Sequence, residues 1–233
     1  MAQAEPPPDV WYADRSNLAS ARKAAEAWRV VAAREPAPGE RAEKGERGAI
    51  FDARWKLARA DYWLGGHVPE RERRTFLESG IEAGRGAIAL EPNRPEGHFW
   101  MAANMGALAE SFGLRQGLKY RTPIKVALET VLRLNPAFQQ GSADRALGRW
   151  YFKVPALFGG SRKEAEAHLR ASLTYNPQNM ASHFFLAEVL LDAGRKDEGR
   201  AELERVIDAP IDPDWAPEDT EFKEKARALL SKR

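Results

Sequence analysis

The stretch from Ala146 to Pro177 carries the spacing that most constrains how this chain folds. Gly148 lies three residues before Tyr151, and Ala165 lies four residues before Leu169. The small residues let two antiparallel helices approach closely, and the large residues fill the space beside them. The proline that closes the stretch stops the second helix. The spacing therefore predicts a pair of packed helices.

The same organisation recurs along the chain. The segment Gly97–Ala103, GHFWMAA, matches the segment Ser182–Glu188, SHFFLAE, and proline ends three helical stretches in the like sequences LEPN, LNPA and YNPQ. The spacing around Gly148 resembles the tetratricopeptide pattern, L-G-x2-Y followed by A-x3-F and proline. We predict an all-α tetratricopeptide-like helical-hairpin solenoid of about ten helices, and the resemblance implies a right-handed superhelix.

Helical periodicity and end signals predict where the helices lie. They are expected over residues 17–34, 48–64, 70–90, from 95, 123–134, 141–153, 161–175, 180–193, 196–207 and 217–230. Gly65 and Gly66 are expected to end one helix as a left-handed cap, and Thr122 with Pro123 to begin another. Residues 36–45 are expected to form a loop. Gly80 and Gly84 share one face, which predicts close contact with a neighbouring helix.

The domain organisation follows from these elements. We expect residues 1–12 to be a flexible, proline-rich terminus. Residues 13–233 are expected to form a single solenoid domain, with a capping helix at 217–231 that shields the end of the repeat stack.

Composition excludes several classes of protein. Lys and Arg number 36 against 34 Asp and Glu, a net charge of +2, which is too balanced for nucleic acid to be the main partner. The chain has no cysteine, so disulfides and thiolate sites are excluded. No apolar run reaches the length of a membrane helix. The start Ala2-Gln3-Ala4 resembles the small-x-small site left by signal cleavage, so we expect a periplasmic or exported protein, with a cytoplasmic one as the alternative.

No pattern of catalytic residues is present. His98 and His183 occupy the same position in related repeats, which favours packing or capping. The metalloprotease spacing H-E-x-x-H and the serine elbow G-x-S-x-G are both missing from the sequence. We therefore expect a protein that is not an enzyme and that uses no metal and no cofactor.

The candidate binding residues lie on the helix of Gly148. Arg145, Arg149 and Lys153 are four residues apart and share one face, which in a tetratricopeptide solenoid lines the concave groove. Three cations there can receive carboxylates of a partner. The alternative is a solvated face, or pairing with Glu188 and Asp192 of the next repeat.

Aromatic residues complete the expected groove. Phe99, Phe152 and Phe184 belong to adjacent aromatic pairs, whose members cannot all face the same way, so some are expected to supply apolar contact beside the cations. The alternative is that they pack in the core. The long turn from Lys153 to Gly160 is a second candidate, because inserted loops often carry function.

Two families resemble the middle of the chain more closely. The helix HFWMAANMGALAE and the segment from Leu132 to Leu173 are similar to the T-component (TatT-like) proteins of TRAP transporters. The shared positions of that segment are Pro136, Phe138, Gly141, Pro155, Gly159, Gly160, Ala165 and Leu169. This resemblance implies a periplasmic helical protein that pairs with a solute-binding protein and holds hydrophobic ligands. The run Leu147–Trp150, LGRW, resembles the regulator-of-microtubule-dynamics proteins, another tetratricopeptide family.

The sequence thus predicts a scaffold rather than a catalyst. We expect the groove to bind a protein or peptide, with a solute-binding protein as one partner and an accessory role in solute transport. The alternative is a periplasmic carrier that holds a hydrophobic small molecule in a TatT-like pocket.

Overall fold

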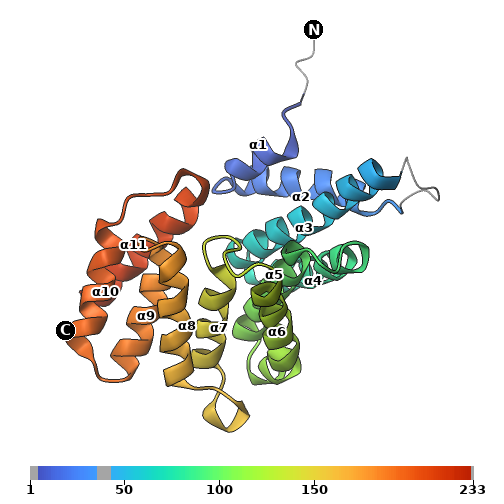
Figure 1. The fold of residues 1–233 in the computed structure, drawn as a ribbon. Coiled ribbons are helices and arrows are strands. Elements are labelled where there is room, and N and C mark those ends of the chain that lie inside the picture. The colour runs from blue at the N-terminus through green and yellow to red at the C-terminus, as the bar shows by residue number, and fades with distance from the viewer. Residues whose placement is uncertain (1–4, 36–42, 232–233) are drawn as a thin grey trace. The chain divides into compact units, whose positions relative to one another are not determined.

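The structure, a computed structural model, describes residues 5–35 and 43–231, and within these ranges it consists of helices with no strand. The α-helices are α1 (Pro8–Ala13), α2 (Leu18–Ala32), α3 (Glu43–His67), α4 (Glu70–Leu90), α5 (Pro95–Ser111), α6 (Leu114–Leu134), α7 (Ser142–Lys153), α8 (Arg162–Tyr175), α9 (Met180–Asp192), α10 (Lys196–Asp208) and α11 (Ala216–Leu230). Two short 3₁₀ turns, η1 (Ala156–Phe158) and η2 (Pro213–Trp215), join some of them (Figure 1). Within each of the two units described below, consecutive helices pack against each other as hairpins, which confirms the predicted fold class.

The contacts divide the chain into two compact units. Unit 1 spans Met1–Leu134 and unit 2 spans Asn135–Arg233, where the sequence predicted one domain over 13–233. The boundary falls at the LNPA sequence, where Pro136 cannot continue α6. Each unit has its own buried clusters and is described by itself below.

Unit 1 is built from α1 to α6. One buried cluster joins α1, α2 and α3 through Tyr12, Trp28 and Trp63, and the indole nitrogen of Trp63 donates to the carbonyl of Arg15 at 2.7 Å. The segment expected to be flexible, 1–12, thus includes part of helix α1, whose Tyr12 is buried. The expected loop at 36–45 lies mostly outside the described residues, and its end belongs to α3.

Glycines let α4 approach α5, as their spacing predicts. A Cβ at Gly84 would lie 2.8 Å from Cβ of Met101, and one at Gly80 would lie 2.3 Å from Oδ1 of Asn104. Both distances are below van der Waals contact, so only a residue without a side chain fits at these two positions.

Two predicted helix ends in unit 1 are wrong. Helix α3 continues past Gly65 and Gly66 to His67, because Gly65 packs against Leu77 of α4 and a Cβ there would lie 2.4 Å from Leu77 Cδ2. Helix α6 begins at Leu114 and carries Pro123 inside it. Buried side chains of α6 on both sides of the proline, Tyr120, Ile124 and Leu128, hold the helix against its neighbour, so packing outweighs the local break.

Unit 2 contains the pairs α7 with α8 and α9 with α10, and α11 packs against α9 and α10. A Cβ at Gly148 would lie 2.6 Å from Cγ of Leu169 and 3.0 Å from the carbonyl oxygen of Ala165. The spacing of these residues therefore marks the close approach of α7 and α8, as predicted. Helix α11 buries Ala226 against a cluster that includes Met180, Leu203 and Val206.

The histidines of the repeated segment have matching roles. Nε2 of His98 lies 2.9 Å from the carbonyl oxygen of Pro92, and Nε2 of His183 lies 2.8 Å from that of Pro177. Each imidazole thus ties the start of its helix to the preceding proline turn, which confirms the predicted capping role. His183 also places Nδ1 2.6 Å from Oε2 of Glu202 on α10.

Side chains cap the starts of α8 and α9. The hydroxyl of Ser161 accepts from the amide of Glu164 at 3.2 Å, and Oδ1 of Asn179 accepts from the amide of Ser182 at 2.9 Å. The Ser161 cap is the one that the spacing Ser161–Glu164 predicts.

We expect Ser161→Ala to destabilise unit 2 by about 1 kcal/mol, because an orphan amide of α8 loses its acceptor. Urea denaturation followed by circular dichroism measures the change. Ser161→Asn is the control, since asparagine retains a capping oxygen and should stay near wild type. Equal losses in the two variants would show that the hydroxyl does not act as a cap.

Among the described residues, no helix has both the length and the apolar character needed to cross a membrane.

Candidate functional site

The cations of α7 meet the acidic residue of α9 that the sequence pointed to. Nη1 of Arg149 lies 3.0 Å from Oε2 of Glu188, and Nζ of Lys153 lies 3.8 Å from Oε1 of the same carboxylate. Arg145, Arg149, Lys153 and Glu188 together carry three positive charges and one negative charge. We call these four residues the α7–α9 face.

An aromatic ring supports the central cation of the α7–α9 face. The Arg149 guanidinium lies 4.5 Å from the ring centroid of Phe185, and its side chain is 26% exposed. Phe185 packs in turn against Phe184 and Phe222. The arginine is therefore held in place while part of it still reaches solvent, as a binding residue requires.

The second acidic residue proposed for pairing, Asp192, lies elsewhere. Its carboxylate accepts from Nε of Arg162 at the start of α8. Helix α8 lies between α7 and α9 in chain order and supplies this arginine, which no sequence pattern singled out. Pairing of Asp192 with the α7 cations is thus wrong for this structure, whereas pairing of Glu188 is present.

The three candidate phenylalanines do not share one environment. Phe99 in unit 1 and Phe184 in unit 2 are buried, at 8% and 7% exposed, so both pack in the core. Phe152 is half-buried against the cluster of Leu186, Val189 and Leu190, and Lys153 Nζ lies 5.1 Å from its ring. Of these three aromatic residues, Phe152 is the one placed next to the cations of α7.

The insert after α7 is a compact, hydrogen-bonded turn. The amides of Phe158 and Gly160 both donate to the carbonyl of Pro155, and the amide of Ser161 donates to the carbonyl of Tyr151. A Cβ at Gly160 would lie 1.7 Å from the carbonyl oxygen of Val154, so glycine is required there. The turn presents the apolar side chain of Leu157 to solvent at 87% exposure.

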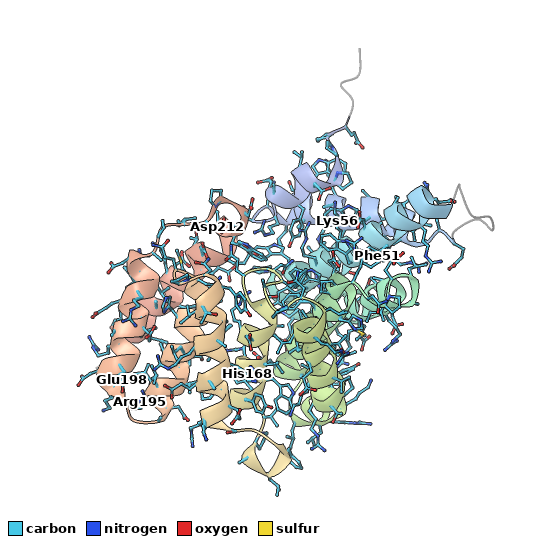
Figure 2. All side chains as sticks on the ribbon, in the orientation of Figure 1. Phe51, Lys56, His168, Arg195, Glu198 and Asp212 are labelled. Atoms are coloured by element: carbon cyan, nitrogen blue, oxygen red, sulfur yellow. The ribbon has the colours of Figure 1, made fainter. Side chains whose placement is uncertain are left out.

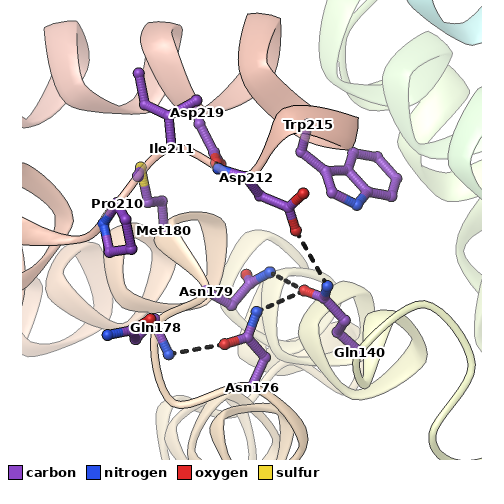
Figure 3. Close-up of a pocket in the computed structure, with 10 residues that line it drawn as sticks. All are labelled: Gln140, Asn176, Gln178, Asn179, Met180, Pro210, Ile211, Asp212, Trp215 and Asp219. Carbon is purple, nitrogen blue, oxygen red and sulfur yellow. Dashed lines mark hydrogen bonds between the residues drawn. The ribbon is translucent and has the colours of Figure 1, made fainter.

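A polar pocket lies next to the α7–α9 face in unit 2. Nη1 of Arg145 is 3.5 Å from Oδ1 of Asn179, and Asn179 lines the pocket (Figure 3). The amide groups of Asn176 and Asn179 both donate to Oε1 of Gln140, at 2.6 and 3.4 Å. Nε2 of Gln140 donates to Oδ2 of Asp212 at 3.3 Å. One glutamine thus links the turn before α7, the start of α9 and the segment before α11.

The backbone around this glutamine is strained. Gln139 and Gln140 have φ of 44° and 59°, and Gly141 follows at 73°. The left-handed region costs a residue with a side chain about 1 kcal/mol or more. At Gly141 a Cβ would lie 2.6 Å from the ring of Tyr175, so no side chain fits. The turn keeps an unfavourable conformation that aims Gln140 into the pocket.

Two carboxylates complete the pocket. Asp212 accepts from the amide of Asp214 at 3.0 Å, and Asp219 accepts from the amide of Asp212 at 2.9 Å. Burial raises the pKa of the Asp219 carboxyl, and the neighbouring charge of Asp212 adds to this effect. Sequence reasoning missed the entire pocket, since Gln140 and Asp212 are 72 residues apart.

The remaining histidine of unit 2 packs inside the α7–α8 hairpin. Figure 2 marks His168 on α8. Its Nδ1 lies 2.7 Å from Oδ1 of Asp144, and its ring stacks on Tyr151 at 5.4 Å between centroids. Within residues 5–35 and 43–231, no group of three or more His, Cys, Asp or Glu is arranged to hold a metal ion.

Comparison with known proteins agrees with the fold and narrows the family. A thermophilic tetratricopeptide protein of Thermus thermophilus, TTC0263, has a similar crystal structure, with a TM-score of 0.55 and 22% identity over 80% of this chain and 91% of that one. No curated protein matches the chain. The model of the family "Regulator of microtubule dynamics protein 1-3" matches residues 41–233. Of the two closer resemblances in the sequence, this is the one that the match bears out, and the chain belongs to the regulator of microtubule dynamics protein 1-3 family.

Proposed function

We propose that this protein is a non-enzymatic scaffold that binds a protein partner on the α7–α9 face of unit 2. The observation that carries the proposal is that Arg149 and Lys153 of α7 both approach the carboxylate of Glu188 on α9. A partner's acidic segment that docks beside Glu188 can share these cations with it. The tetratricopeptide-like fold and the family's name, which refers to microtubule dynamics, support a protein as the partner.

Phe152 and Leu157 are the two apolar residues that we expect a partner on the α7–α9 face to contact. Phe152 lies beside Lys153, and Leu157 projects from the turn that follows it. Interfaces combine a few apolar anchors with surrounding charges, and the charges act mainly on specificity and on the rate of association. The expected ligand is therefore an extended acidic segment that also carries an apolar residue.

Selection of random peptides displayed on phage tests this proposal. We expect peptides retained by the wild type to be enriched in Asp and Glu, and their affinity to fall as salt rises. Arg149→Ala/Lys153→Ala should weaken a selected peptide by about 2 kcal/mol if the partner desolvates the arginine, and by about 1 kcal/mol or less if the pair stays exposed. Calorimetry measures the loss.

Arg200→Ala/Arg227→Ala is the matched control, because it removes two exposed cations from α10 and α11 of the same unit. Wild-type affinity in this control, with a loss in the α7 variant, supports the α7–α9 face. A selection without acidic enrichment, or equal losses in both double variants, would contradict it. Loss in Leu157→Ser alone would move the binding site to the turn of residues 154–160.

The predicted solute-binding partner, the periplasmic location and the small-molecule carrier remain separate proposals. Pairing with a solute-binding protein in the periplasm is tested by co-purification from the native host and by fractionation of its compartments. The alternative, a carrier of a hydrophobic small molecule, needs an apolar cavity, and ligand pockets usually enclose about 300–1,000 Å³. The pocket of unit 2 measures about 120 Å³ and is lined largely by amides and carboxylates. A second hollow, in unit 1, measures about 630 Å³, but it is open to solvent and three of its five lining residues are charged, namely Glu70, Arg71 and Arg74. Neither matches an enclosed apolar cavity, which favours the scaffold.

A further inference from the structure

The polar pocket of unit 2 has the size of one side-chain terminus. Its volume is about 120 Å³, which is several times the ~30 Å³ share of one liquid water and well below a usual small-molecule site. It is bounded by the turn before α7, the start of α9, the segment before η2 and the start of α11 (Figure 3). A ligand that fits here is the end of a side chain, not a whole metabolite.

The hydrogen bonds within the pocket use the side-chain amides of Asn176, Asn179 and Gln140 as donors and leave acceptor sites on the carboxylate of Asp212. The amide groups of Asn176 and Asn179 donate to Gln140, and the Gln140 amide donates to Asp212. A carboxylate offers about four acceptor sites. Asp212 takes two of these bonds, one from Gln140 and one from the amide of Asp214. A ligand that brings donors therefore finds acceptor sites at Asp212.

The charge of the pocket also favours a ligand that carries hydrogen-bond donors, since such a ligand can be positive. The described residues that line it include the carboxylates of Asp212 and Asp219 and no Lys or Arg. A cation nearby, Arg145, contacts Oδ1 of Asn179. Two carboxylates in a partly enclosed site favour a positive ligand, because such a ligand offsets the cost of holding them together away from water.

The indole of Trp215 forms one wall of the pocket, and its flat face suits a planar cation. The indole of Trp215 stands beside the Asp212 carboxylate (Figure 3). A guanidinium stacks on aromatic faces and donates in pairs to carboxylates, whereas an ammonium acts as a point charge. The indole and the carboxylates together match the planar fork of an arginine.

We propose that this pocket is a specificity site for an arginine side chain of the bound protein. The guanidinium lies against Trp215 and donates to Asp212 and Asp219, while Gln140 fixes the position of Asp212. This inference rests on the proposed function, since the arginine belongs to the partner on the α7–α9 face. It also gives that partner a direction, because its acidic segment and its arginine lie at different ends.

A capped amino acid tests the pocket apart from the face. Nα-acetyl-arginine amide is titrated into the ¹⁵N-labelled full chain, and the side-chain amides of Gln140 and Asn176 and the indole of Trp215 are followed by NMR. We expect saturable shifts at these groups. Nα-acetyl-citrulline amide, which has nearly the same shape without the charge, should bind at least about tenfold more weakly, the factor that 1.4 kcal/mol represents.

Variants separate the charge from the shape of the site. Asp212→Asn/Asp219→Asn keeps the size and an acceptor oxygen at both positions, so it should fold and lose at least about tenfold in affinity for the arginine probe. Trp215→Leu is a second variant that leaves both carboxylates in place. It should weaken binding of Nα-acetyl-arginine amide more than binding of Nα-acetyl-lysine amide, because the planar guanidinium loses the ring on which it stacks. Glu204→Gln, an exposed residue in the middle of α10, is the matched control and should bind as wild type.

Three results would overturn the assignment. They are equal binding of the arginine and citrulline probes, shifts confined to residues outside the pocket, and the absence of saturable shifts with arginine. The proposed function fails on different measurements, namely the peptide affinities of the Arg149 and Lys153 variants. Arginine binding in the pocket without acidic peptide binding on the α7–α9 face would retain the pocket and reject the face.

Discussion

Replacing Gly148 by leucine is expected to destabilise unit 2 by about 3 kcal/mol. The first carbon of the new side chain would lie 2.6 Å from Cγ of Leu169 and 3.0 Å from a backbone oxygen of α8. Leu169 is fully buried and has little room to move, and the Ala165 carbonyl is part of the helix backbone. The hairpin of α7 and α8 must therefore open. Urea denaturation measures the loss as a lower midpoint at constant slope.

Gly106→Ala is the control for the effect of removing a helical glycine. Gly106 lies inside α5, and a Cβ there meets nothing within 4 Å. This change should leave stability unchanged or raise it by up to about 1 kcal/mol, because alanine favours the helix. Wild-type stability of Gly148→Leu would mean that α7 and α8 do not pack through this glycine.

Asp61 is expected to make the stability of unit 1 depend on pH. Its side chain is fully buried on α3, and one oxygen lies 3.5 Å from Nη2 of Arg29. The other oxygen, Oδ2, has no hydrogen-bond partner among the residues that the structure describes. Burial raises the pKa of this carboxyl from 3.8 to about 7, against the opposing effects of Ser79 and Arg29.

The sign of the pH effect follows from this raised pKa. The stability that Asp61 contributes is fully present below pH 3.8 and is lost as pH rises through about 7, since the folded state binds the proton more tightly. The difference between the two pKa values corresponds to about 4 kcal/mol. Asp61→Asn has no proton to lose, so its stability relative to wild type should rise by about this amount between about pH 4 and pH 8.

Denaturation of both proteins across this pH range measures the effect. Glu26→Gln is the control, because Glu26 also pairs with Arg29, at 2.6 Å, but is exposed. Its stability relative to wild type should show little change with pH. A difference in stability between Asp61→Asn and wild type that stays constant across this pH range would show that folding does not raise the pKa of Asp61.

The sequence by itself determined the fold class and much of the candidate face. Gly148, Ala165 and Leu169 lie within one hairpin, so their spacing reports directly on which side chains meet. The spacing of four between Arg145, Arg149 and Lys153 places them on one side of α7 in the same way. Glu188 could be named as their partner because corresponding positions of consecutive repeats face each other.

Tertiary structure decided the features that join distant parts of the chain. Gly65 and Pro123 are end signals in sequence, yet both lie inside helices because packing against a neighbour outweighs a local preference. Phe184 is buried because α11 adds Phe222 to its surroundings. Asp61 and the Gln140–Asp212 pocket have no local signature at all. Burial and long-range hydrogen bonds arise only when helices far apart in sequence are brought together, and spacing along one helix does not encode them.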